Sequence, residues 1–101
     1  MSYERIMGIQ VSDETEYQKY REAMEPLLIS IGGSFGFDFK IAEVLRSKTD
    51  EPINRVFTLS FDSKQVMDDF FSSADYLTIR EQHFDKSVSS KTVIALYSTD
   101  D

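Results

Sequence analysis

The stretch RVFTLSFDSKQVMDDFFSSADY, residues 55–76, decides the fold because it predicts a strand that leads directly into helical segments. Phe57, Leu59 and Phe61 alternate with other residues, and this period of two gives a strand one buried face. Ser63 follows as a helix N-cap, because its hydroxyl can accept a hydrogen bond from an unpaired amide of the next turn. The stretch therefore predicts a strand that becomes a helix at Ser63.

A second helical run follows the first, and either Ser72 or Ser73 supplies its N-cap. Its apolar and aromatic residues fall at helical steps, and the only histidine of the chain lies among them. The residues of this run are Tyr76, Leu77, Ile79, His83 and Phe84. We therefore expect two helical segments after the strand.

Upstream, residues 5–11 predict a first strand, and Asp13 with Glu16 has the spacing of a capping box at a helix start. The apolar residues of this helix, at steps of three and four, form a core face. They are Tyr17, Tyr20, Met24, Leu27, Leu28 and Ile31. Because a proline inside a helix costs about 3 kcal/mol, we expect a kink or a local break just before Pro26. Gly32-Gly33 then predicts the C-cap.

The period returns to two from residue 34, which predicts a long second strand that continues to about residue 45. The residues that share one face of it are Phe35, Phe37, Phe39, Ile41, Glu43 and Leu45. A polar, turn-rich segment at residues 47–52 predicts a hairpin to the strand that starts at Arg55. Residues 91–97 alternate again and predict the last strand.

The elements run strand, helix, strand, strand, helix, strand, which is the βαββαβ order of α+β ferredoxin-like domains. Residues 1–101 are expected to form one such domain with a four-stranded antiparallel sheet. Right-handed crossovers place both helical segments on one face of that sheet. The other face is left with exposed apolar side chains, and such patches mark interfaces. We therefore expect a homodimer that pairs two sheets face to face.

The composition of the chain indicates which classes of partner and which cellular location to expect. The net charge of −7, without a dense Lys/Arg cluster, argues against a nucleic-acid partner, since phosphate binding needs a basic surface. No apolar run approaches the roughly 20 residues that cross a membrane, and there is no cysteine for disulfide or thiol chemistry. The first residues lack the basic and apolar segments of a secretory signal, so a cytoplasmic location is expected.

Four residues are candidates for a functional site. His83 is the natural general acid or base, because a histidine side chain titrates near neutral pH, and the alternative is an imidazole packed beside the sheet. Arg55 and Glu43 are expected on paired strands, where they would orient a carboxylate or carbonyl of a ligand or form a structural ion pair. Tyr76 would donate a hydrogen bond to a ligand oxygen or anchor its helix.

Adjacent carboxylates occur twice, at Asp68-Asp69 and at Asp100-Asp101. Neighbouring side chains on a helix point in different directions, so solvated charge explains them better than a metal site. We expect no metal ion and no organic cofactor. Two functions remain open, a module that binds a small, partly apolar metabolite and a cofactor-independent enzyme with His83 as its proton carrier.

Several residues, at their joint spacing, carry a family resemblance. They are Tyr17, Tyr20, Gly32, Gly33, Phe35, Glu43, Arg55, Phe61, Ser63, Ser73 and Tyr76. In this pattern the sequence resembles the domain-of-unknown-function family DUF1330, a group within the dimeric α+β barrel superfamily, over nearly the whole chain. Asp38 and His83 depart from the pattern, because that family often has arginine at both positions.

The resemblance implies a ferredoxin-like fold and a dimer, and it leaves the activity open. The family has no settled biochemical role. Related barrels include cofactor-independent monooxygenases, dehalogenating or isomerising enzymes and small-ligand sensors, and a shared fold does not imply a shared function.

Overall fold

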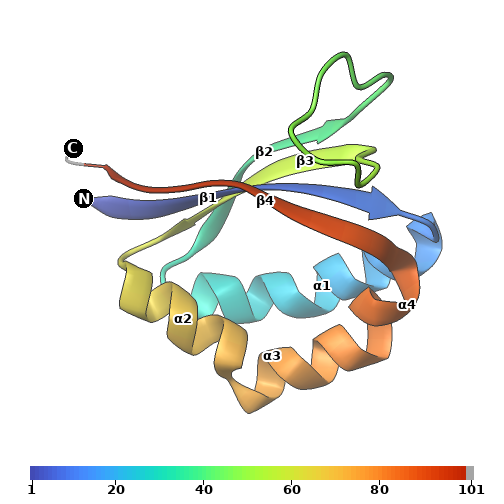
Figure 1. Cartoon of the computed structure of the whole chain (residues 1–101). Helices are drawn as coiled ribbons and strands as arrows, with labels where there is room; N and C mark the ends of the chain where they lie inside the picture. The colour runs from blue at the N-terminus through green and yellow to red at the C-terminus, as the bar shows by residue number, and fades with distance from the viewer. Residues whose placement is uncertain (100–101) are drawn as a thin grey trace.

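The chain forms a four-stranded antiparallel sheet with its helices on one face, as Figure 1 shows. This computed structural model describes residues 1–99. The strands, in the spatial order β2-β3-β1-β4, are β1 (Ser2–Val11), β2 (Ser34–Lys40), β3 (Arg55–Phe61) and β4 (Val88–Thr99). The helices are α1 (Glu14–Ser30), α2 (Lys64–Ser72), α3 (Ala74–Ile79), the π-helical turn η1 (Arg80–Phe84) and α4 (Asp85–Ser87). The predicted βαββαβ ferredoxin-like architecture is confirmed.

Side-chain caps start the three main helices where the sequence predicts them. The carboxylate of Asp13 accepts a hydrogen bond from the Glu16 amide, at 3.0 Å, and starts α1. The hydroxyls of Ser63 and Ser73 accept hydrogen bonds from the backbone of their own first turns and start α2 and α3. Ser73, rather than Ser72, is therefore the second cap.

Helix α1 ends as predicted, but it does not break at Pro26. Gly32 has a φ of 81°, and the amides of Gly32 and Gly33 bond to the carbonyls of Ile29 and Leu28 in the paired pattern of a Schellman cap. The helix runs unbroken from Glu14 to Ser30 with Pro26 on its exposed side. Burial of the stripe on its opposite side outweighs one lost backbone bond, so the predicted break is wrong.

Strand β2 is shorter than predicted and changes face part-way. It ends at Lys40, and a register shift in its pairing with β3 separates Phe35 from Asp38. The extra residue of this bulge puts Asp38 on the helix side of the sheet, while Phe37 and Phe39 lie on the open side. The predicted single aromatic face of residues 35–45 is therefore wrong.

A loop of residues 41–54 replaces the predicted end of that strand. The loop is closed at its base, because the Ile41 amide donates to the Asn54 carbonyl at 2.9 Å. The Asn54 side chain then brackets Val11, accepting from its amide at 2.8 Å and donating to its carbonyl at 2.9 Å. Strand β4 begins three residues before the predicted position and extends two beyond it.

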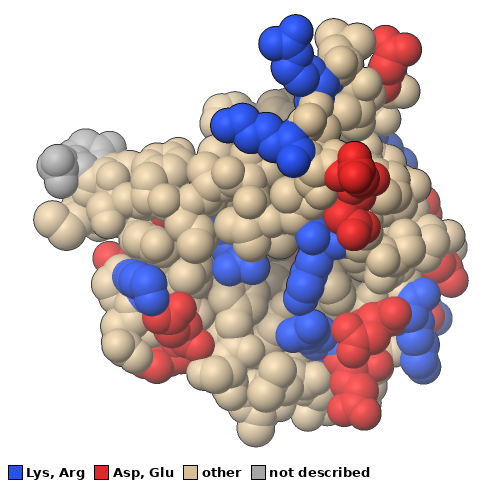
Figure 2. Space-filling view, in the orientation of Figure 1, with Lys and Arg blue, Asp and Glu red and all other residues tan. Residues whose placement is uncertain are grey.

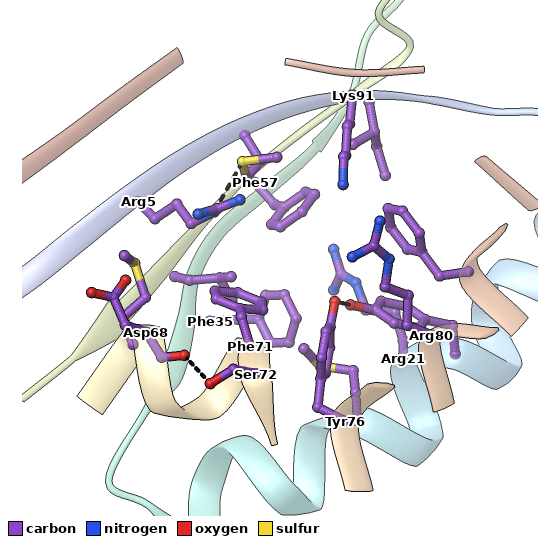
Figure 3. Close-up of a pocket in the computed structure, with 17 residues that line it drawn as sticks. Arg5, Arg21, Phe35, Phe57, Asp68, Phe71, Ser72, Tyr76, Arg80 and Lys91 are labelled. Carbon is purple, nitrogen blue, oxygen red and sulfur yellow. Dashed lines mark hydrogen bonds between the residues drawn. The ribbon is translucent and has the colours of Figure 1, made fainter. Parts of the chain in front are cut away.

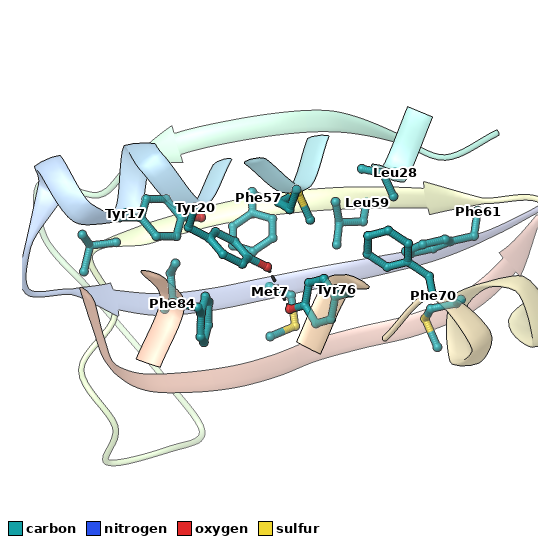
Figure 4. Close-up of a cluster of buried hydrophobic side chains, with 14 residues drawn as sticks. Met7, Tyr17, Tyr20, Leu28, Phe57, Leu59, Phe61, Phe70, Tyr76 and Phe84 are labelled. Atoms are coloured by element: carbon teal, nitrogen blue, oxygen red, sulfur yellow. Dashed lines mark hydrogen bonds between the residues drawn. The ribbon is translucent and has the colours of Figure 1, made fainter. Parts of the chain in front are cut away.

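The core lies between the sheet and the helices and is rich in aromatic rings, as Figure 4 shows. Its buried hydrophobic residues are Met7, Ile9, Val11, Tyr17, Tyr20, Met24, Leu28, Phe57, Leu59, Phe61, Met67, Phe70, Tyr76 and Phe84. Rings from different elements touch one another, as Phe61 does with Phe70 at a centroid distance of 6.0 Å. This core fixes the helices over one face of the sheet.

In the described part of the chain, residues 1–99, the other face of the sheet carries no helix. Phe37 and Phe39 are 65% and 52% exposed there, and their rings stack with centroids 5.7 Å apart. Within residues 1–99, no helix combines the length and the apolar character that crossing a bilayer requires. The exposed rings thus form an apolar patch on the sheet, the kind of surface that marks an interface.

Candidate functional site

The core is incompletely filled, and a cavity of about 300 Å³ remains between the sheet and the helices. Figure 3 shows side chains from both layers pointing into it. Apolar side chains from β1, β3 and α1 form much of its wall, including Met7, Leu59 and Met24. Residues of β2, α2, α3, η1 and β4 complete it. The cavity is therefore enclosed by elements from both ends of the chain.

Two buried tyrosines share a hydrogen bond at this cavity. The hydroxyls of Tyr20 and Tyr76 lie 2.8 Å apart, and Figure 3 shows the Tyr76 hydroxyl at the centre of the view. Burial raises the pKa of both phenols, that of Tyr20 strongly. Both therefore stay protonated, and two hydroxyl hydrogens are present where the pair itself uses only one.

Cationic side chains gather at the cavity although the chain has a net charge of −7. Four cations line it, Arg5, Arg21, Arg80 and Lys91, against one carboxylate, that of Asp68. In Figure 2, Lys and Arg side chains lie along the upper and right-hand edges of the hollow between the sheet and the helices. Arg21 pairs with Asp38 and Arg80 with Asp85, so the positive charge of the cavity rests mainly on Arg5 and Lys91.

Arg5 and Lys91, here called the cavity cations, have no carboxylate partner within 4.0 Å in residues 1–99. Arg5 instead donates to the Met7 sulfur at 3.2 Å, and its guanidinium lies 4.8 Å from the centre of the Phe71 ring. Burial lowers the pKa of both groups, and the positive charges of Arg80 and Arg5 lower that of Lys91 further. The fold therefore holds two cations without a paired carboxylate, whose charges Asp68 and Asp85 compensate only in part.

A second group of charges, here called the Asp38 cluster, consists of Asp38, Arg21 and Arg55. Arg55 donates twice to the Asp38 carboxylate, at 2.9 Å each, and Arg21 donates twice at 3.2 and 3.3 Å. These bonds, those of Arg55 first, hold the pKa of Asp38 below its usual range. Arg21 also donates to the Tyr17 hydroxyl at 2.8 Å. The cluster is a satisfied ion network beside the cavity.

This cluster settles where Arg55 lies. Its partner is Asp38, with Glu14 at 3.7 Å, and it does not line the cavity. Glu43 is exposed in the loop of residues 41–54 and lines a separate hollow on the open side of the sheet. The predicted pairing of Arg55 with Glu43 is therefore wrong, because the strand that would carry Glu43 ends three residues earlier. Their roles in ligand binding stay predictions.

His83 lies outside both of these hollows. Its Nδ1 is hydrogen-bonded to the Glu16 carboxylate in the first turn of α1, and its side chain is 26% exposed. This bond lowers the pKa of Glu16. His83 thereby ties η1 to α1, and its predicted role as proton carrier has no geometric support at the cavity.

Tyr76 is the one predicted site residue that lies in the cavity wall. Arg5 and Lys91 were missed, although the sequence held a signal for each. Arg5 has the same parity as Met7 and Ile9, so it is a charge on the buried face of its strand. Lys91 pairs with Ile9 and shares that face.

No group of three or more His, Cys, Asp and Glu side chains in residues 1–99 is arranged to hold a metal ion. Asp68 accepts a bond from Lys64 and Asp69 one from Gln65, which fits solvated side chains on α2. Asp100-Asp101, the other acidic pair in the sequence, lies outside the described residues.

Comparisons with known proteins agree with this architecture. A family described as "Domain of unknown function (DUF1330)" matches residues 5–96. No curated protein matches the sequence. A solved protein of unknown function from Rhodopseudomonas palustris is 14% identical with a TM-score of 0.78, over 99% of this chain and 83% of the other.

Two further solved structures share the fold at low identity. A dimeric ferredoxin-like protein of unknown function from Thermobifida fusca is 10% identical, with a TM-score of 0.62 over 98% of this chain and 92% of the other. A putative antibiotic biosynthesis monooxygenase from Nitrosomonas europaea is 18% identical, with a TM-score of 0.60 over 97% and 89%. These likenesses show the ferredoxin-like fold.

Proposed function

The chain belongs to the DUF1330 family, a domain of unknown function, and on that premise we propose that it binds a small, partly apolar metabolite in the cavity between the sheet and the helices. One observation carries the proposal. A cavity of about 300 Å³ remains in a core that is otherwise filled with aromatic rings. Pockets that bind small molecules begin at about this volume and combine an apolar wall with a few polar groups.

The wall of the cavity has this composition. Phe35, Phe57 and Phe71 supply ring surface, while the Tyr20–Tyr76 hydroxyl pair supplies polar atoms at one place. Interiors normally pack to crystal density, so leaving this volume empty sacrifices the dispersion contacts of its walls. A ligand that fills it would restore those contacts.

A screen of metabolite classes by thermal shift tests the proposal, because a ligand that binds only the folded protein raises its melting temperature. The substitution Ser72→Trp would place a large ring at the cavity wall and is expected to abolish the shift. Thr78→Trp is the matched control, since Ser72 and Thr78 are both exposed and both donate to the carbonyl four residues earlier. Thr78 does not line the cavity, so this variant should keep the shift. Equal loss in both variants would contradict the assignment of the site.

We also propose that two copies pair through the open face of the sheet. Phe37 and Phe39 form an exposed apolar patch there, and dimerisation would remove it from water. Sedimentation should give twice the monomer mass, and Phe37→Asp should give the monomer mass. Ile29→Asp is the control, because Ile29 is 60% exposed on helix α1. A monomeric wild type at micromolar concentration would refute the proposal.

The enzymatic alternative, with His83 as general acid or base, stays a prediction. His83→Gln removes the titrating group while keeping a polar side chain that can bond to Glu16. If a ligand found in the screen is turned over, loss of turnover in this variant with unchanged ligand affinity would support the alternative.

A further inference from the structure

The cavity cations are held at a free-energy cost that the protein itself offsets only in part. Burial and mutual repulsion lower the pKa of Lys91, so its charged form is less stable here than in water. Arg5 likewise lies partly buried over an aromatic ring without a carboxylate partner in residues 1–99. An anion placed between the two cations would reverse this cost.

The tyrosine pair adds a directed hydrogen-bond donor. Tyr20 and Tyr76 contact each other through their hydroxyls, and no other hydrogen bond of either hydroxyl occurs in the described part of the chain. Because one hydroxyl must donate to the other, the second hydrogen has no acceptor in the protein. A ligand oxygen at this point would accept it.

The positions of these groups agree with one another. In Figure 3, Arg5 points into the cavity from one side and Lys91 from the sheet above, while Tyr76 rises from the helix layer. Their donors therefore face a common space from three directions. The rings of Phe35, Phe57 and Phe71 also line that space. The cavity thus offers an anion site next to an aromatic wall.

We infer that the ligand of this cavity is a compact carboxylate with an aromatic body, whose carboxylate is bound by Arg5 and Lys91 and accepts the free hydrogen of the tyrosine pair. The inference rests on the proposed function and specifies its ligand class. A carboxylate suits the site because it carries one charge and two acceptor oxygens, and charge-assisted bonds to arginine and lysine are the strong ones. A phosphate ester carries more charge and a third oxygen into a largely apolar cavity, which raises its desolvation cost.

Isothermal titration with matched probes tests the inference. Benzoate, phenylacetate and indole-3-acetate are each compared with their uncharged carboxamides, and phenyl phosphate serves as the alternative anion. At least one acid should bind at least tenfold more tightly than its amide. Higher salt should lower the affinity for the acid, because added ions screen the charge of the exposed Lys91. The affinity for the amide should not change.

Single substitutions then test which cations bind the carboxylate of the ligand. Lys91→Met and Arg5→Met keep an apolar chain but remove the cation, and each should weaken acid binding by about 10- to 100-fold, as expected for the loss of one charge-assisted bond. Lys19→Met is the control, because Lys19 lies on the outer side of α1, 60% exposed and away from the cavity. It should leave the affinity unchanged. Lys91 is exposed, so its variant tests the inference even if Arg5→Met fails to fold.

The outcomes separate the inference from the proposed function. If amides bind as tightly as acids, or if Lys91→Met and Lys19→Met weaken acid binding equally, the carboxylate assignment is overturned while the cavity remains a binding site. Tighter binding of phenyl phosphate than of every carboxylate overturns it as well. If no probe binds at millimolar concentration and the metabolite screen is also empty, both the inference and the proposed function fail.

Discussion

Two groups of cationic side chains lie at or beside the cavity, and they differ in whether a carboxylate of the protein pairs with them. In the Asp38 cluster, Arg21 and Arg55 both donate twice to one carboxylate, and their side chains are only 11% and 13% exposed. The cavity cations, Arg5 and Lys91, have no such partner in residues 1–99. Positive charge is neutralised by a carboxylate in the Asp38 cluster, whereas in the cavity it is left available to a ligand.

This difference distinguishes charged residues that stabilise the fold from charged residues that are available to bind a ligand. An arginine bound to a carboxylate of its own chain stabilises the native state and has few donors left for a ligand. A half-buried cation without a partner destabilises the free protein, and proteins rarely keep such a group without a use for it. Arg55, the cation that the sequence singles out, is of the first kind, whereas Arg5 is of the second.

The largest expected effect comes from breaking the Asp38 cluster. Asp38→Asn keeps the shape of the side chain but leaves Arg21 without a counter-charge and Arg55 with only the exposed Glu14 at 3.7 Å, and it should lower the free energy of unfolding by about 2 kcal/mol. Urea denaturation measures this. Asp69→Asn is the control, because Asp69 is exposed and accepts only from Gln65, and it should change stability by less than about 0.5 kcal/mol. Equal effects of the two substitutions would show that the cluster is not structural.

A smaller effect should follow acidification. The pKa of Asp38 is lower in the folded protein, so its contribution to stability is present above the unfolded value of about 3.9 and is lost as the pH falls through the folded value below it. The stability gap between wild type and Asp38→Asn should therefore narrow below about pH 4. Urea titrations at neutral pH and at successively lower pH values test this, and a constant gap would contradict the assigned cause.

The smallest effect, and one of opposite sign, is expected at the cavity. Lys91→Met removes a cation that burial and Arg80 disfavour, so the ligand-free variant should be as stable as wild type or more stable by a few tenths of a kcal/mol. Lys64→Met removes a lysine that pairs with Asp68 at 2.7 Å, and it should be neutral or slightly destabilising. A clear loss of stability in Lys91→Met would mean that Lys91 has a structural role.

Local chemistry made most of the fold predictable. The caps at Asp13, Ser63 and Ser73 and the left-handed Gly32 depend on residues within one turn of each other, and all four are confirmed. Burial of α1 overrode the local cost of Pro26.

The bulge in β2 depends on a contact between distant residues. The Phe37 amide donates to the Thr58 hydroxyl at 2.7 Å, and a Cβ on Gly36 would lie 2.4 Å from the same oxygen. The alternation of aromatic residues in the sequence does not predict this contact. Asp38 therefore moves to the helix side of the sheet for a reason that only the paired strands reveal.

The candidate site was predictable in part. Tyr76 was identified from its own helix, but the groups around it come from both ends of the sequence. Arg5 and Lys91 meet because β1 pairs with β4, and their partners in that pairing are Leu96 and Ile9. A pattern read along the chain does not show which strands will be neighbours, so the positive cavity emerged only from the structure.

The pairing of β1 with β4 also affects the order in which parts of the protein fold. Ser2 pairs with Thr99, so β1, which is synthesised before β4, has its second edge covered only after β4 has been made. Contacts so far apart in sequence slow folding, because a long loop must close before they form. The cavity is lined by both Arg5 and Lys91, so we expect it to be among the last parts of the protein to form during folding.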